Sequence, residues 1–323
     1  MPRISVISVL LPTLLAAHGL RKKSLSLGGA LTAFVAGFMM ISGSTGTAGQ
    51  DLGLKVWAVS LIGFYLLGSR ATKYGKERKK VLEAGYHDYG NRSAWQVLSN
   101  SFSAVVACFA WNLLFVPQGV HMWIMGALTA GALKVPSDLM RPYGDDWCPL
   151  SKDVSGGWSR ALLFAALGHF ACCLGDTLAS ELGILSSSPP RLVTTWKPVP
   201  PGTNGGVSAG GTLASLTGGI IMGLMMSICL ILENSACRGA WVSLSKDLIL
   251  WGALGGLGGS GIDSLLGATI QMTRYDDERK LVVDDAAESD GKLKVIGGLN
   301  ILTNNQVNVV SSVCSAIIIG LLA

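Results

Sequence analysis

The sequence predicts an all-α, polytopic integral membrane protein, a bundle of about seven to nine hydrophobic segments in one domain spanning residues 1–323. Half of the residues (50%) are hydrophobic and only 14% are charged, whereas an ordinary soluble domain carries about 25% charged residues. The mean hydropathy is +0.47, and 42 glycines recur along the apolar runs. Because no long polar linker divides the chain, these observations together favour one Gly-rich bundle of membrane helices.

Two basic clusters predict the orientation of the first three apolar segments, residues 4–20, 25–42 and 54–68. The run 21–23 follows the first segment, and the basic stretch 70–92 follows the third. Cytosolic loops carry an excess of Lys and Arg, so both clusters are placed in the cytosol and the N-terminus across the membrane. A signal peptide has its charges before the apolar core, so residues 4–20 are expected to be a retained helix. The clustering indicates topology rather than nucleic-acid binding.

The later apolar segments are 102–116, 121–135, 158–185, 209–232, 248–269 and 299–322. The first two are short for full spans and are predicted to form a hairpin, so either could be tilted or re-entrant. Strict alternation of spans would put the residues after 185 on the face opposite the basic stretch 70–92. Re-entrance of one short segment would remove that conflict, and the sequence leaves the choice open.

The stretches between these segments are expected to be irregular. Residues 136–157, 186–208 and 271–298 are predicted loops, and no strand pattern is visible. The glycines of residues 252–261 have the spacing that lets helix backbones approach closely in lipid, so packing is the expected role for most of them.

The seven cysteines predict neither zinc binding nor a disulfide framework. Five of them lie in apolar runs, where a thiol behaves as a small hydrophobe: Cys108, Cys172, Cys173, Cys229 and Cys314. No Cys-x-x-Cys pair and no Cys/His grouping with metal-ligand spacing is present.

Two carboxylates, Asp176 and Glu181, follow an apolar run at a position where hydrocarbon is expected. An ionised side chain at such depth costs about 3 kcal/mol, so it tends to face a cavity, pair or bind a cation. On a helix, Asp176 stacks with Ser180 and Thr177 stacks with Glu181, so the two acids lie on adjacent faces. A frayed helix end in water is the alternative, but a polar intramembrane site is favoured.

Asp263 begins a second polar element. Asp263-Ser264 repeats the order of acid and hydroxyl seen in Asp176-Thr177, and Gln271 lies on the same helical face as Asp263. A solvated acid at a helix end is the alternative to a site role.

A third element lies in the last apolar segment. Asn300, Asn304, Asn308 and Ser311 have the spacing of one polar stripe along a helix. Because amides in lipid need partners, the stripe predicts either interhelical hydrogen bonds or ligand contacts.

Two further stretches could hold phosphate. The Gly-rich loop 198–206 lies directly ahead of a helix, where free backbone N–H groups attract anions, and Arg191 and Lys197 flank it. No Gly-Lys-Ser or Gly-Lys-Thr follows, so the loop is no Walker motif, and a plain connector is the alternative. In the basic stretch, Lys73 and Lys76 are the phosphate candidates, whereas Arg78, Lys79 and Lys80 are expected to fix topology.

These elements together predict an enzyme that acts on a phosphorylated lipid. Mg²⁺ binds through one or two carboxylates plus substrate phosphates, and phosphoryl transfer requires mainly positioning and charge neutralisation. A cation-coupled transporter or carrier and a non-catalytic membrane regulator are the alternatives.

Five motifs, in the same order along nearly the whole chain, resemble transmembrane protein 19 and its wider domain-of-unknown-function family. They are Gly175-Asp176-Thr177-Leu178-Ala179-Ser180-Glu181, Pro190-Arg191-Leu192-Val193-Thr194-Thr195-Trp196-Lys197, Pro201-Gly202-Thr203-Asn204-Gly205-Gly206, Asp263-Ser264-Leu265-Leu266-Gly267-Ala268-Thr269 and Asn304-Asn305-Gln306-Val307-Asn308. The wider family includes the plastid phytyl-phosphate kinase, and it is similar to nucleotide-dependent lipid kinases such as dolichol and phytol kinases. The resemblance implies a helical membrane enzyme that uses CTP or a similar nucleotide with Mg²⁺.

The residues and the resemblance together assign expected roles. Asp176, Glu181 and Asp263 would be the catalytic acids and hold Mg²⁺. Phosphates would bind Lys73, Lys76, Arg191, Lys197, Gly202, Thr203 and Gly205, and the lipid phosphate substrate or the nucleotide would contact Thr177, Ser180, Asn304 and Asn308.

One residue and one segment depart from the plastid enzymes. Those enzymes have a charged residue where this chain has Asn204, and no transit peptide is visible here. An endomembrane such as the endoplasmic reticulum, and an isoprenoid phosphate other than phytyl phosphate, are therefore expected.

Overall fold

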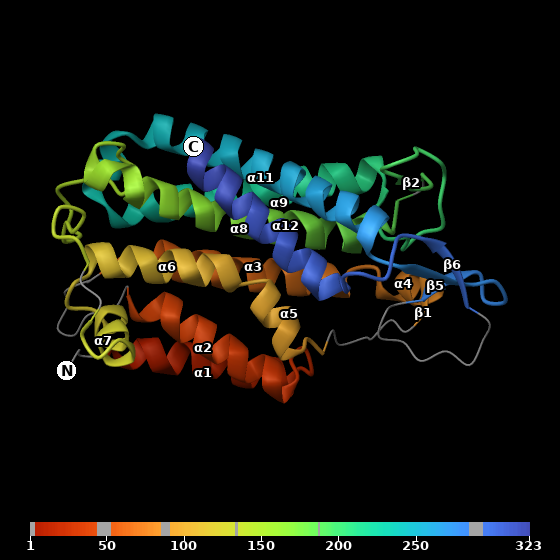
Figure 1. Ribbon diagram of the computed structural model, residues 1–323, viewed down its shortest axis with the longest axis horizontal. Helices are drawn as coiled ribbons and strands as arrows, with labels where there is room; N and C mark the ends of the chain where they lie inside the picture. The colour runs from red at the N-terminus through yellow and green to blue at the C-terminus, as the bar shows by residue number, and fades with distance from the viewer. Residues whose placement is uncertain (1–3, 44–52, 85–90, 133–134, 187, 284–292) are drawn as a thin grey trace.

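The computed structural model describes residues 4–43, 53–84, 91–132, 135–186, 188–283 and 293–323, and it is mostly helical. The longer helices lie roughly alongside one another: α1 (Val6–Arg21), α2 (Leu27–Ser42), α3 (Val56–Lys73), α6 (Phe102–Phe115), α8 (Trp158–Gly183), α9 (Ala209–Glu233), α11 (Trp241–Ile270) and α12 (Asn304–Leu322) (Figure 1). Short helices connect or flank them: α4 (Lys76–Leu82), α5 (Ala94–Ser99), α7 (Val120–Leu128), the 3-10 turn η1 (Val154–Gly157) and α10 (Ser235–Gly239).

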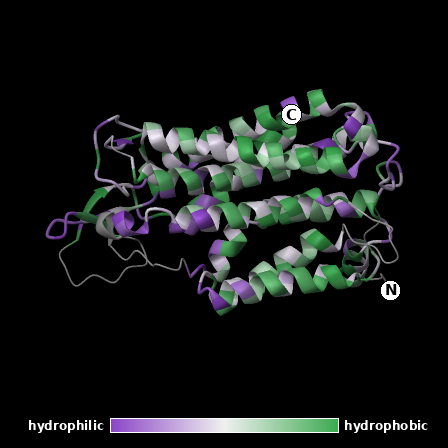
Figure 2. Ribbon diagram, turned by 180° about the vertical axis from the view of Figure 1, so that it is seen from behind, coloured by the Kyte–Doolittle hydropathy of each residue, from purple (hydrophilic) through white to green (hydrophobic). Residues whose placement is uncertain are grey.

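The membrane character predicted from the sequence is confirmed. Within the described part of the chain, three helices have the length and composition to cross a membrane: residues 154–183, α9 and α12. The bent pair of α6 and α7 would be a fourth, and α1 and α2 are shorter apolar helices. Figure 2 shows hydrophobic residues along the helices and hydrophilic residues gathered at the ends of the bundle. Exposed leucines such as Leu31, Leu213 and Leu321 fit contact with lipid rather than water.

Helix α8 lies at the centre and packs against α3, α6, α9, α11 and α12. Small residues bring the backbones together: a Cβ on Gly175 would lie 3.0 Å from the Cα of Gly256, and one on Gly218 would lie 3.0 Å from the Cα of Gly175. The predicted packing role of the glycines is therefore confirmed at Gly256. Close backbone approach is what stabilises helix pairs where lipid removes the hydrophobic driving force.

The described residues 121–132 form no returning span, which corrects the predicted hairpin, whereas the alternative of a re-entrant segment agrees with the bend between α6 and α7. Helix α7 ends at Leu128, and it is bent by 98° from α6 after a short break that contains Pro117. Proline cannot continue a helix, because it lacks the N–H and clashes with the preceding turn. The chain therefore crosses the bundle once rather than twice in this region, and the topological conflict disappears. Lys79 and Glu181 indeed lie at one end, 2.6 Å apart.

Residues 271–298 were predicted as a loop, and that prediction was wrong. They contain β4 (Thr273–Asp276), β5 (Leu281–Val283) and β6 (Leu293–Gly297), which form a sheet in the order β1-β5-β4-β6 with β1 (Glu83–Ala84). The β-branched and aromatic residues of these strands favour extended backbone. A two-stranded pair, β2 (Arg191–Leu192) and β3 (Gly206–Val207), orders the Gly-rich loop. Both sheets lie at the α4 end of the bundle (Figure 1).

A disulfide joins Cys148 to Cys237, although the sequence predicted none. The two cysteines are separated by 89 residues and meet because α8 and α9 return the chain to the same end of the bundle. Two cysteines so far apart in the sequence match no known disulfide motif, so their pairing could not be predicted before the fold was known.

Candidate functional site

The carboxylates of Asp176 on α8 and Asp263 on α11 lie close enough inside the helix bundle to interact electrostatically. The hydroxyl of Ser260, also on α11, lies near the Asp176 carboxylate. Ser311 Oγ on α12 donates to Asp263 Oδ2 at 2.9 Å. The Nδ2 atom of Asn308, with its amide turned so that it donates, lies 3.2 Å from the same oxygen. Three helices thus contribute to one polar centre.

Helical spacing and small residues explain why this centre forms. Ser260 and Asp263 are three residues apart on α11, and Asn308 and Ser311 are three apart on α12, so each pair shares a helical face. Gly259 lets α11 approach α8, since a Cβ there would lie 2.5 Å from that of Cys172. The polar faces are thereby brought into contact.

The predicted stripe on the last segment is shorter than expected. Helix α12 begins at Asn304, so Asn300 lies before the helix and outside the stripe. Asn304 is exposed at the first position, and its carbonyl lies 3.2 Å from the turned amide of Asn308. The cause is the turn before it, where Leu299 and Ile301 donate backbone hydrogen bonds to the carbonyls of Thr269 and Ile270.

Glu181 does not join the acid pair. It forms an ion pair with Lys79, whose Nζ lies 2.6 Å from Oε2 of Glu181. The same ammonium donates to the carbonyls of Ala71 at 3.0 Å and Thr72 at 3.3 Å. The Lys79 side chain is 1% exposed and that of Glu181 is 23% exposed. All three ammonium donors therefore have acceptors in a buried setting.

Lys79 was expected to fix topology, whereas Lys73 and Lys76 were expected to hold phosphate. In the structure, Lys73 and Lys76 are exposed, whereas the side chain of Lys79 is buried. Charge alone could not separate these lysines in the sequence, because burial depends on where α4 packs.

Arg92 is a second inward-facing cation that the sequence did not single out. Its backbone pairs with the turn between α1 and α2, where Arg92 N donates to Ser24 O and Ser26 N donates to Arg92 O. Its guanidinium donates to Ser69 Oγ at 3.2 Å and Thr72 Oγ1 at 3.4 Å. The Ser93–Gln96 capping box that follows was readable as a helix start, but it says nothing about where the arginine points.

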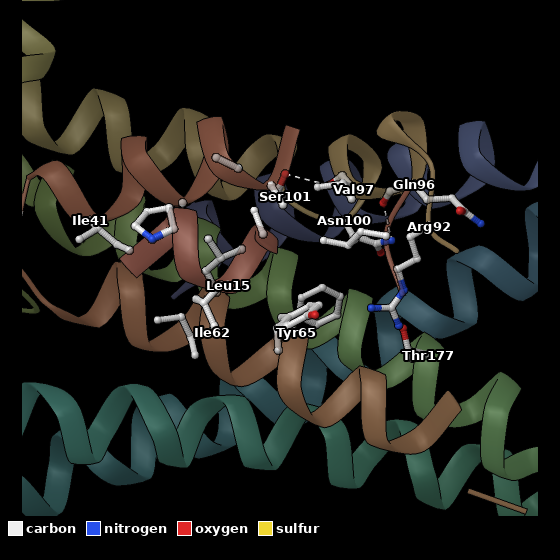
Figure 3. A pocket seen from close by; sticks show the side chains of 18 residues that line it. Leu15, Ile41, Ile62, Tyr65, Arg92, Gln96, Val97, Asn100, Ser101 and Thr177 are labelled. Carbon is white, nitrogen blue, oxygen red and sulfur yellow. Dashed lines mark hydrogen bonds between the residues drawn. The ribbon is translucent and has the colours of Figure 1, made fainter. Parts of the chain in front are cut away.

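A cavity of about 120 Å³ lies between α1, α2, α3 and α5. Apolar side chains line most of it, including Leu15, Ile41 and Ile62. Its polar lining residues are Tyr65, Arg92, Gln96, Asn100, Ser101 and Thr177, and Arg92 and Thr177 lie at one end of it (Figure 3). Figure 3 shows the Arg92 guanidinium directed toward Thr177 at that end. Thr177 follows Asp176 in α8, so the polar end of the cavity is one residue removed from the acid pair.

The Gly-rich loop packs on the end of α11 rather than lying free. Asn204 N donates to Thr273 Oγ1 at 3.2 Å, and its side-chain Nδ2 donates to Met272 O at 3.0 Å. Gly205 has φ +73° and stands where a Cβ would meet Ala268 and the carbonyl of Ser264. Thr203 is buried and donates to Pro200 O at 2.7 Å. The loop therefore needs glycine for this close approach.

The remaining predicted residues lie at the surface or bond locally. Arg191 and Lys197 are exposed, and Arg191 donates to the carbonyl of Trp196 at 2.8 Å. Ser180 donates to the carbonyls of its own helix, at 3.0 Å to Asp176 and 3.1 Å to Thr177. Arg191 and Lys197 thus flank the loop at the same end of the bundle as Lys79.

The acidic side chains suit Mg²⁺ binding by two carboxylates rather than by three. Within the described residues, no group of three or more His, Cys, Asp or Glu side chains could hold a metal ion. The expected trio of Asp176, Glu181 and Asp263 is therefore reduced to the pair Asp176 and Asp263. Two carboxylates suffice for Mg²⁺ where substrate phosphates complete the coordination.

The fold and the site define a polytopic helical membrane protein with a carboxylate pair inside its helix bundle. The sequence profile of the integral membrane protein family DUF92 matches residues 10–316. The chain belongs to this family.

Similar proteins come from a plant, an archaeon and a cyanobacterium. Protein PGR from Arabidopsis thaliana is 35% identical over 307 residues, which cover 95% of this chain and 91% of the relative. An uncharacterized membrane protein of Methanocaldococcus jannaschii is 24% identical over 82% of both chains. One from Synechocystis is 24% identical over 68% of both chains. No solved structure matches the chain significantly.

Proposed function

We propose that this protein is a membrane-embedded kinase that transfers a phosphoryl group from CTP or another nucleoside triphosphate to an isoprenoid monophosphate in an endomembrane. An oxygen of the lipid phosphate attacks the terminal phosphorus of the nucleotide, and the bond to the bridging oxygen breaks. The products are an isoprenyl diphosphate and a nucleoside diphosphate.

The observation that carries this proposal is the pairing of Asp176 with Asp263 inside the bundle, beside cations at the same end. Two nearby carboxylates repel each other unless a cation or proton neutralises them. Asp176 and Asp263 would hold Mg²⁺, which would supply positive charge to offset the charge that develops on the phosphates during transfer. Asn308 and Ser311 orient Asp263 through hydrogen bonds.

The basic groups supply what phosphates require. Arg191 and Lys197 are exposed beside the Gly-rich loop, and Lys73 and Lys76 are exposed between α3 and α4. They can meet a water-soluble nucleotide, whereas Arg92 and Lys79 face inward. The exposed cations suit a water-soluble nucleotide, and the inward-facing cations suit the phosphate of a lipid substrate.

A cation-coupled carrier is the second candidate, because ionisable pairs inside a membrane also mark ion pathways. A carrier needs Asp176 and Asp263 but has little use for exposed bases beside the loop. The two functions therefore differ in their dependence on Arg191 and Lys197.

The test is incubation of purified protein with terminally labelled CTP or ATP and a panel of isoprenyl monophosphates, with Mg²⁺ or with chelator. We expect label in an isoprenyl diphosphate only with Mg²⁺, and a loss of at least tenfold in kcat/KM for Arg191→Gln or Lys197→Gln. Absence of transfer, together with cation-dependent solute uptake into proteoliposomes, would favour the carrier.

A further inference from the structure

We infer that the cavity between α1, α2, α3 and α5 binds a single-chain lipid phosphate, with the phosphate on Arg92 and the apolar chain along α2 and α3. This inference rests on the proposed function for the reaction, but the binding site itself is argued from the cavity and its charges.

Among the described residues that line the cavity, Arg92 is the one with a charged side chain. Lys79 is paired with Glu181 at 2.6 Å, and the guanidinium of Arg92 has only the hydroxyls of Ser69 and Thr72 as side-chain acceptors in the described structure. Glu181 acts electrostatically on Arg92, but it is already paired with Lys79. An inward-facing cation without its own counterion is costly unless an anion pairs with it.

The donors around Arg92 suit a phosphate. A guanidinium has five N–H groups in a planar fork that matches phosphate oxygens, and two of these bonds are occupied by neutral hydroxyls. The hydroxyls of Tyr65 and Thr177 and the amides of Gln96 and Asn100 line the same cavity. A phosphomonoester would therefore meet one charged and several neutral donors.

The rest of the cavity suits an apolar chain. Its walls carry Leu15, Ile41, Leu61, Ile62 and Phe64, with small residues such as Ala33 between them. A volume of about 120 Å³ is somewhat smaller than a cavity of about 150 Å³ that binds one benzene molecule. It holds the first part of a chain, and the remainder must pass between helices into lipid. A head group with one chain fits this shape better than a two-chain phospholipid.

Binding is measured with purified full-length protein in detergent, by titrating fluorescent farnesyl monophosphate. Unlabelled farnesyl monophosphate, farnesol, inorganic phosphate and phosphatidic acid serve as competitors. We expect competition in the order farnesyl monophosphate, then farnesol, with inorganic phosphate and phosphatidic acid at least tenfold weaker than farnesyl monophosphate. Arg92→Gln should weaken farnesyl monophosphate at least tenfold and leave farnesol within twofold. Arg92→Lys should recover part of the loss.

Two further variants separate the site from general damage. Ile62→Trp places an indole in the apolar part and should weaken both farnesyl monophosphate and farnesol, whereas Arg78→Gln removes an exposed arginine of α4 and should change neither. Melting temperatures without ligand identify variants that fail to fold. If Arg92→Gln fails to fold, Arg92→Lys is compared with the wild type instead. Unchanged binding in Arg92→Gln and Ile62→Trp, or equal competition by inorganic phosphate, would overturn the inference.

The same variants distinguish this inference from the proposed function. If wild-type protein transfers phosphoryl groups but Arg92→Gln has unchanged KM for the lipid, the pocket assignment is wrong and the kinase stands. If Arg92-dependent binding is found but no nucleotide supports transfer, the pocket stands and the kinase is wrong.

Discussion

At the scale of single residues, the ion pair between Lys79 and Glu181 shows how a charge can be tolerated inside the bundle. The lysine ammonium reaches one carboxylate and two backbone carbonyls, so each of its donors has an acceptor. Breaking such a pair from one side leaves the other charge buried, which costs more than the pair itself contributes.

Replacing Glu181 with Gln should therefore destabilise the protein by about 3 kcal/mol, the lower end for buried pairs, because Lys79 keeps its two carbonyl acceptors. Thermal unfolding in one detergent measures the change. Adding Lys79→Met to Glu181→Gln should restore most of the loss, since neither charge then remains.

The matched control is the exposed pair of Arg141 and Asp146, at 3.2 Å with side chains 47% and 71% exposed. Asp146→Asn should cost about 0–1 kcal/mol. Equal shifts for Glu181→Gln and Asp146→Asn would contradict the buried role of Lys79.

Sequence reasoning identified the acids that lie near each other but not the cations around them. Asp176, Asp263 and Asn308 stand out because polar groups are rare in apolar runs, and the structure brings these three together. Lys79 and Arg92 lie in a basic stretch in which any Lys or Arg could serve to fix the membrane orientation. Only the packing of the folded chain shows that these two side chains point inward. Glu181 lies on the same helix as Asp176 but on another face, and its partner comes from α4.

At the scale of helices, the glycines decide how closely α8, α9 and α11 can pack. Gly256 of α11 is buried, and a Cβ there would lie 2.5 Å from Ser215 O and 2.9 Å from the Cα of Gly219. These are backbone atoms, so no side-chain rotation relieves the clash. Gly258 on the same helix is exposed and has nothing within 4 Å of a Cβ.

Gly256→Ala should accordingly destabilise the bundle by about 1–3 kcal/mol through overpacking. Gly258→Ala should be neutral or stabilise by up to about 1 kcal/mol, because alanine favours the helix more than glycine does. Melting temperatures of the two variants in the same detergent provide the comparison. A loss of stability in Gly258→Ala as large as that in Gly256→Ala would show that the close helix contact is not the cause.

Several long helices could be predicted from the sequence, although α11 begins at Trp241 rather than at residue 248 and the strands were missed. Apolar runs predicted α8 and α9 to within a few residues, since few polar residues interrupt them. Strands β4 to β6 are short, and β1 pairs with β5 from a distant part of the chain. These strands pair because the ends of α3 and α11 lie close together in the fold. A local sequence pattern cannot predict such an arrangement.

At the scale of the whole molecule, the disulfide and the basic stretch lie at opposite ends of the bundle (Figure 1). Disulfides persist in oxidising compartments, and basic loops stay in the cytosol. The two signals agree on one orientation, which predicts that the Gly-rich loop and the exposed bases face the cytosol.

We therefore expect Asn91, which heads an Asn-Arg-Ser sequon in the basic stretch, to remain unglycosylated in cells. Cys148 and Cys237 should resist alkylation until a reductant is added. Glycosidase-shift gels and mass spectrometry of alkylated peptides measure the two outcomes. A glycan on Asn91 would invert the orientation and remove the access of cytosolic nucleotide to the bases.

We propose that Asp176 and Asp263 hold the Mg²⁺ that the protein needs to transfer a phosphoryl group. The most direct measurement combines label transfer from CTP to farnesyl monophosphate with thermal unfolding, each with Mg²⁺ and with chelator, for wild type, Asp176→Asn and Asp263→Asn. Each variant should lower transfer at least 100-fold and lose any Mg²⁺-dependent stabilisation. In chelator both variants should melt at or above the wild-type temperature, because the amide relieves carboxylate repulsion. Variants that keep full transfer, or that melt lower than wild type in chelator, would contradict the claim.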